Sequence, residues 1–369
     1  MDLIRARRSG LVSKRRLDID ILRIVGILFV VMYHYGSLSG LGGKWMSAYI
    51  GAFLSCCVPI FFFVSGVLHA RRDQTWSSGF SKAVKLLVLT VLWSMALWIV
   101  ISLQRGSQIA FNLWVAGILT FQQGYTNIFW FLPAMAIVYM LAPIFCVVRD
   151  GHRDTFRAMV IGACLAVFGL DLLQRGGYIA GLYFETDIFN KAIYFLNQFN
   201  PLRGIYGYSI AYFLVGMYIG GLDYRPKTAR FGVISLLLCI VSPIGLAMYK
   251  VMFDKLTNGN YDPVFGGYSC ISTLILTVSL YYLVGILTDR LPDCGRVSGA
   301  IKFLGVNAFA VYLLHMFVRP LITTAVQSVW PAWIATAVSV LLAMSAVVVL
   351  TIIGSILKRT KMGSWLLTA

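Results

Sequence analysis

Residues 17–36 read LDIDILRIVGILFVVMYHYG, an apolar stretch whose formal charges all lie near its beginning. As a helix rising about 1.5 Å per residue, such a stretch covers about 30 Å, the thickness of a bilayer's hydrocarbon core. Similar stretches recur along the 369 residues, of which 59% are hydrophobic and 12% are charged. Soluble domains are roughly half apolar and a quarter charged. The composition excludes an ordinary soluble enzyme and predicts an all-α, polytopic membrane helix bundle.

Apolar runs bounded by charged or turn residues predict about ten transmembrane helices. They lie near residues 18–38, 48–69, 82–104, 128–148, 156–173, 204–222, 229–250, 269–288, 300–319 and 332–357. A further run, Phe111 to Phe121, is too short to cross and is expected to be a re-entrant or interfacial helix. The expected organisation is a basic segment 1–17, a single transmembrane domain 18–357 and a short tail 358–369. Segment 174–203 is expected to be the longest outer loop.

The basic residues predict the orientation of these spans. With the N-terminus in the cytoplasm, 22 of the 31 lysines and arginines fall on inner segments and eight on outer segments. Cytoplasmic loops of membrane proteins collect Lys and Arg, so both termini are expected to be cytoplasmic. This bias accounts for the net charge of +17 without a nucleic-acid partner. The expected location is the inner (plasma) membrane, as a multi-pass protein in contact with the lipid bilayer.

The seven cysteines are scattered through the chain, mostly inside apolar runs, and form no C-x-x-C pair. Free cysteine behaves as a small buried hydrophobe, so these residues are interpreted as packing residues. The sequence therefore predicts no metal site and no disulfide framework.

Three polar residues of the first span are candidates for function, because ionisable groups inside a membrane are costly. Arg23 and His34 are eleven residues apart, which places them on one helix face, about 20° and about 16 Å apart. Asp20 precedes Arg23 at ion-pair spacing. The structural alternatives are that Arg23 snorkels to the inner surface and that His34 bonds a neighbouring helix.

Two layers of polar residues emerge along the predicted bundle. The inner layer joins Arg23 to Ser65 and to the i,i+3 pair Lys82 and Lys85. This layer suits a phosphate-bearing ligand, although packing at Ser65-Gly66 and inner-surface anchoring by the lysines are the alternatives. The outer layer holds His34, Trp130, Tyr312 and His315. It suits proton transfer to a polar, ring-shaped acceptor, although a lone Trp there is more often an aromatic-belt residue.

Four motifs, in order, resemble the acyltransferase-3 family of integral membrane O-acyltransferases. They are D-x-x-R with a histidine eleven residues later (Asp20, Arg23, His34), PIFFFVSG, FWFLPAM…YMLAP, and LG-x-N…VYLLH. The resemblance implies transfer of an acyl group, acetyl by default, from cytoplasmic acyl-CoA to a hydroxyl of a carbohydrate or glycolipid at the outer face. It implies His34 as the general base. The residues implied at the acyl-CoA site are Arg23, Ser65, Lys82 and Lys85, and those that support it or bind acceptor are Asp20, Trp130, Asn307, Tyr312 and His315.

The chain departs from the family pattern at the third span, where Lys82 and Lys85 stand in place of the family's usual pair of arginines. Lysine keeps the charge but lacks the bidentate fork of arginine. Succinyl is left open as the acyl group, and the sequence leaves the oligomeric state open, a homodimer included. The competing interpretation is a transporter or flippase of a lipid-linked or acylated polysaccharide, in which His34 would carry protons along a pathway.

Overall fold

The computed structural model describes residues 16–35, 43–105, 111–120, 124–222, 226, 228–257, 265–290, 295–327 and 331–368. These residues form helices and connecting turns without a strand, which confirms the predicted all-α class. Of the basic segment 1–17, only Arg16 and Leu17 are among them.

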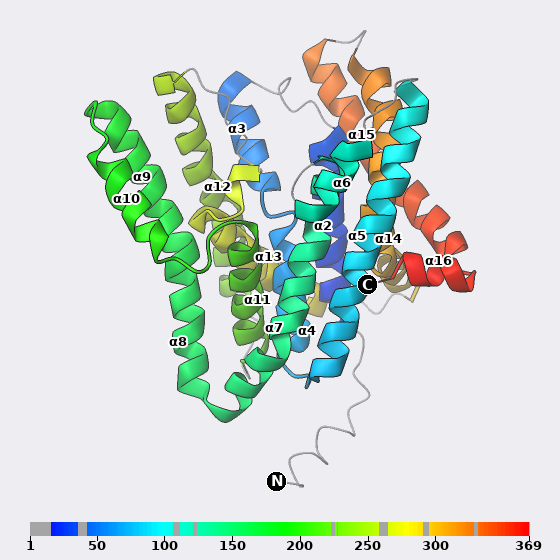
Figure 1. The fold of residues 1–369 in the computed structure, drawn as a ribbon, viewed down its shortest axis with the longest axis horizontal. Coiled ribbons are helices and arrows are strands. Elements are labelled where there is room, and N and C mark those ends of the chain that lie inside the picture. Colours follow the sequence, from blue (N-terminus) through cyan, green and yellow to red (C-terminus); the bar gives the residue numbers. More distant parts are fainter. Residues whose placement is uncertain are drawn as a thin grey trace.

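The long helices reproduce the predicted spans (Figure 1). They are α2 (Leu17–Tyr35), α3 (Gly43–Leu54), α4 (Pro59–His69), α5 (Trp76–Arg105), α7 (Phe131–Gly151), α8 (Arg153–Cys164), α9 (Leu170–Tyr183), α11 (Ile205–Gly220), α12 (Ala229–Thr257), α13 (Ile271–Arg290), α14 (Gly295–Gln327) and α15 (Ala332–Leu357). Within the described part of the chain, eight segments are long and apolar enough to cross a membrane. The other two predicted spans correspond to α2, which carries Asp18, Asp20 and Arg23, and to the 16-residue α11.

The second predicted span is interrupted, which the apolar pattern did not indicate. Residues 55–58 form a turn between α3 and α4, and Pro59 is the first residue of α4. Proline has no backbone N–H to continue the ladder of α3, so the helix restarts there. The Ser55 hydroxyl lies 2.6 Å from the Ala52 carbonyl oxygen and 2.7 Å from the Thr273 hydroxyl. The break carries Val58 to the wall of a central cavity.

Most of the segment 174–203, predicted to be the longest outer loop, is helical. The fifth span continues through a π-helical turn, Leu165–Gly169, into α9, and α10 (Ile188–Gln198) folds back against α9. In Figure 1 this pair forms a hairpin at the upper left. Asp171 bonds Arg175 (2.6 Å) and the Ser269 hydroxyl (2.7 Å), and Arg175 also donates to the Gly266 carbonyl. These contacts tie α9 to the segment that leads into α13.

The first helix lies inside the bundle. α2 packs against α14, α15, α13 and α4, and Leu22, Ile27 and Val31 are almost fully buried. α4 pairs closely with α11, and α5 pairs with α7. This arrangement places the polar face of α2 against α4, which carries Ser65, and α14, which carries Asn307, Tyr312 and His315.

The short segment after α5 is a helix of its own, α6 (Phe111–Thr120), of ten residues. Ten residues rise about 15 Å, half the hydrocarbon thickness. The Trp114 indole donates to the Ser94 hydroxyl at 3.2 Å, which fastens α6 to α5. We expect reporters fused after Arg105 and at Gln123 both to read as outside. An inside reading at Gln123 would mean that this segment crosses the membrane and that the ten-span count is wrong.

Candidate functional site

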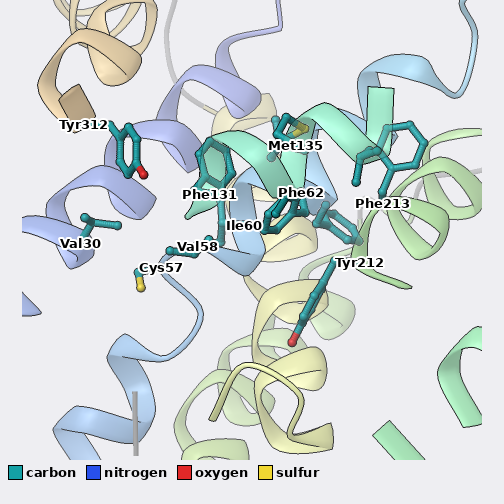
Figure 2. Packing of buried hydrophobic residues seen from close by; sticks show 14 of the residues in the cluster. Val30, Cys57, Val58, Ile60, Phe62, Phe131, Met135, Tyr212, Phe213 and Tyr312 are labelled. Carbon is teal, nitrogen blue, oxygen red and sulfur yellow. The ribbon is translucent and has the colours of Figure 1, made fainter. Parts of the chain in front are cut away.

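A cavity of about 420 Å³ lies between α2, α4, α5, α7 and α14. Four cations line one part of it, namely Arg23, Arg72, Lys82 and Lys358, and no carboxylate is among its described lining residues. The other part is mostly apolar. Figure 2 shows Tyr312 and Phe131 facing each other there, with Val30 and Val58 beneath them. The cavity is therefore cationic in one part and mostly apolar in the other.

Arg23 lines the cationic part and pairs with Asp20, as the spacing predicted. Their side chains approach to 3.9 Å, with Asp20 buried and Arg23 one-third exposed. A Cβ on Gly305 would lie 2.7 Å from the Cβ of Asp20, so only glycine lets α14 approach α2 this closely. The glycine of the LG-x-N motif therefore has a structural role, because it lets α14 pack closely against Asp20, the partner of Arg23.

Ser65 and Lys82 also line the cationic part. The Lys82 ammonium lies 5.3 Å from the ring centroid of Tyr139, which also lines the cavity. His69, one turn after Ser65, lies with its Nδ1 2.7 Å from the Ser65 carbonyl oxygen. The structure thus brings Arg23, Ser65 and Lys82 together as the sequence predicted.

Lys358 and Asn307 form a pair that sequence reasoning did not anticipate. The Lys358 ammonium donates to Asn307 Oδ1 at 2.9 Å, and the Asn307 amide donates to the Phe303 carbonyl at 2.9 Å. Burial lowers the pKa of Lys358 below its ordinary value, because the charged form loses solvation. Asn307 therefore holds a cavity cation and does not itself line the cavity.

The polar cavity residues that the sequence did not single out are Arg72, His69, Tyr139, Lys358 and Thr368. Arg72 and Lys358 belong to the inner-surface cations, and no spacing within one helix distinguishes them from the other members of that set. Lys85 lies beside the cavity and is not part of its wall. Its ammonium donates to the Thr368 hydroxyl at 3.1 Å and lies 5.8 Å from the Trp365 ring centroid.

His34 and His315 lie together, with ring centroids 5.2 Å apart. His315 is 1% exposed, and its Nδ1 lies 2.6 Å from the Tyr312 carbonyl oxygen. That contact makes Nδ1 the donor, and Nε2 has no hydrogen-bond partner among the described residues. The Tyr35 hydroxyl donates to the His315 carbonyl at 2.6 Å. Tyr312, which lines the apolar part of the cavity, lies 5.9 Å from the His315 ring, so the cavity approaches the histidine pair.

Trp130 lies in an aromatic group outside the cavity wall. Its ring centroid is 5.6 Å from that of Tyr268 and 6.0 Å from that of Tyr208. The next residue, Phe131, contacts Tyr312 at 5.4 Å. The FWFLPAM motif therefore links this aromatic group to the apolar part of the cavity.

No group of three or more His, Cys, Asp or Glu side chains suited to a metal occurs in the part of the chain that the structure describes. The six cysteines in that part are free thiols.

No curated protein and no solved structure matches the chain. The acyltransferase-3 family model, described as an acyltransferase domain, matches residues 16–358. This match contains every candidate residue of the cavity and of the histidine pair except the segment after 358. Because the match covers nearly the whole chain, the protein belongs to the acyltransferase-3 family and is a multi-pass membrane acyltransferase.

Proposed function

We propose that the protein transfers an acyl group, acetyl by default, from cytoplasmic acyl-CoA to a hydroxyl of a carbohydrate or glycolipid at the outer face of the plasma membrane. The observation that carries this proposal is the cavity, which is cationic in one part and approaches His34 and His315 in the other. Such a division would let a soluble phosphorylated donor bind at the cationic part and an external acceptor approach the histidine pair.

The charge of the cavity matches the phosphates of the donor. Coenzyme A carries a diphosphate and a further phosphate, and the thioester lies at the end of a long, mainly uncharged arm. Arg23, Arg72, Lys82 and Lys358 offer four cations with no carboxylate among the described lining residues. Charge-assisted hydrogen bonds to phosphate are about twice as strong as neutral ones. The arm would then extend past Val58 and Phe131 toward Tyr312.

His34 is proposed as the general base. A neutral imidazole removes the proton of the acceptor hydroxyl as its oxygen attacks the thioester carbonyl, the C–S bond breaks, and the proton passes to the departing CoA thiolate. His315 packs against His34 and is fixed by its bond to the Tyr312 carbonyl, so it is proposed to position the base and the acceptor. Trp130, which is partly exposed and packs on the buried rings of Tyr208 and Tyr268, is proposed to support acceptor binding, because sugar rings stack on aromatic rings.

The proposal is tested by acyl transfer in purified, membrane-reconstituted protein. We expect CoA release from acetyl-CoA that depends on an added envelope glycan. We also expect the glycans of a deletion strain to lack the mass of one acyl group found in the parent. That mass distinguishes acetyl from succinyl. Export of an unmodified lipid-linked glycan without thioester turnover would instead support the transporter interpretation.

Replacing Lys82 with Ala should raise the Kd for CoA at least about tenfold, because a charged hydrogen bond contributes about 1.5–3 kcal/mol and each 1.4 kcal/mol is a factor of about ten. Lys82→Arg should preserve binding, since it keeps the charge and adds a fork. Lys85→Ala should have a smaller effect, because Lys85 lies beside the cavity and not in its wall. Binding is measured by calorimetry, with Lys302→Ala, an exposed residue early in α14, as the matched control. Unaltered affinity in Lys82→Ala would remove this lysine from the donor site.

A further inference from the structure

Residues 358–368 fold back along the bundle. α15 ends at Leu357 and is followed by the short helix α16 (Lys361–Leu366). Thr360 caps the N-terminus of α16, and its hydroxyl accepts from the Gly363 N–H at 3.0 Å. A Cβ on Gly363 would lie 2.0 Å from the Leu357 carbonyl oxygen, so glycine is needed for this tight reversal. The reversal aims the residues after α16 back toward α5.

Three contacts fasten this segment to α5. The Trp93 indole donates to the Leu366 carbonyl at 3.3 Å, Lys85 donates to the Thr368 hydroxyl at 3.1 Å, and Lys85 lies over the Trp365 ring. Thr368 in turn donates to the Ser364 carbonyl at 2.7 Å. The hydroxyl of Thr368 is therefore fixed between α16 and the lysine.

Leu367 closes a gap in the cavity wall. α5 packs mainly against α7 and makes little contact with α14. Leu367, only 1% exposed, lines the cavity together with Leu86 of α5 and Val306 of α14. Thr368, Lys82 and Lys358 line the same cavity. Lys82 and Leu86 are one helical turn apart on α5, and Thr368 bonds Lys85 between them, so the segment lies where a cation of the wall is followed by an apolar side chain.

We propose that Leu367 and Thr368 are part of the acyl-CoA site and contact the donor where its phosphates give way to the pantetheine arm. This inference rests on the proposed function. Leu367 supplies an apolar wall for the arm, and Thr368 holds the Lys85 ammonium beside the phosphates. Because the family match ends at residue 358, this wall is a feature of this chain beyond the matched domain.

The test is protection of an introduced thiol in the full chain. Thr368→Cys is labelled with a maleimide, with and without desulfo-CoA, a donor analogue that has no thiol of its own. At about 100 times its Kd the analogue leaves about one site in a hundred empty, so labelling at 368 should slow at least tenfold. Met362→Cys, in the adjoining helix α16 but 74% exposed and outside the cavity wall, should label at the same rate in both conditions. Labelled peptides are identified by mass spectrometry.

A second variant tests the wall by affinity. Leu367→Asp should raise the Kd for desulfo-CoA at least about tenfold, whereas Met362→Asp should leave it within about twofold. If wild type binds the analogue but labelling at 368 is unchanged or faster, the inference is wrong and the proposed function stands. If wild type fails to bind the analogue, both are overturned.

Discussion

Replacing His34 with Ala should lower the rate of acyl transfer about 10²–10⁴-fold, the contribution of a positioned general base. CoA binding should stay within about twofold of wild type, because the cation at Arg23 lies about 16 Å along the same helix. The two quantities are measured separately on protein reconstituted in nanodiscs. Initial rates report the chemistry, and calorimetry with CoA reports donor binding.

His152 supplies the matched control for this substitution. It is an exposed histidine at the junction of α7 and α8 and is not part of the cavity wall, so His152→Ala should transfer at the wild-type rate. His315→Ala should reduce transfer less than His34→Ala, through loss of the ring that packs against His34. Near-normal turnover in His34→Ala would show that His34 is not the base, and a larger loss in His315→Ala would exchange the two roles.

The sequence was sufficient for the spans and for relationships within one helix. Hydrophobic segments long enough to cross a membrane are local features, so their positions could be predicted, although α5, α12 and α14 extend five to eight residues beyond the predicted edges. Asp20 and Arg23 are three residues apart, so helical periodicity predicted that their side chains could pair, and they do. The break at residues 55–58 was not predicted, because the residues on both sides of Pro59 are apolar and a hydropathy pattern does not show a turn there.

The rest of the cavity depends on contacts between helices distant in sequence. Lys358 lines the cavity because α15 packs on α14, where Asn307 Oδ1 accepts a hydrogen bond from the Lys358 ammonium. Tyr139 faces Lys82 because α7 pairs with α5. The two lysines of α5 look equivalent in sequence, yet Lys82 lines the cavity and Lys85 meets Thr368. The three-residue offset turns the two side chains about 60° apart, and the neighbouring helices decide which one lines the cavity.

Replacing Gly66 with Ala should destabilise the protein by roughly 1–3 kcal/mol or more, the range for overpacking a tight interface. A Cβ at Gly66 would lie 2.0 Å from the Phe213 carbonyl oxygen, and one at Gly216 would lie 2.0 Å from the Phe63 carbonyl oxygen. Both obstacles are backbone atoms of the facing helix, so α4 and α11 must separate to admit even a methyl group. Small residues at such crossings let membrane helices approach closely.

The separation of α4 and α11 should also affect the cavity, because Ser65 precedes Gly66 and lines it. We therefore expect Gly66→Ala to lower the thermal midpoint in detergent and to weaken CoA binding at temperatures where the protein is folded. Gly162→Ala is the matched control, since nothing lies within 4 Å of its added Cβ in helix α8. Alanine there should be neutral or stabilising by up to about 1 kcal/mol, its helix-propensity advantage over glycine. Equal midpoints for the two variants would mean that α4 and α11 are not in close contact, and the VSG motif would then need a purely chemical explanation through Ser65.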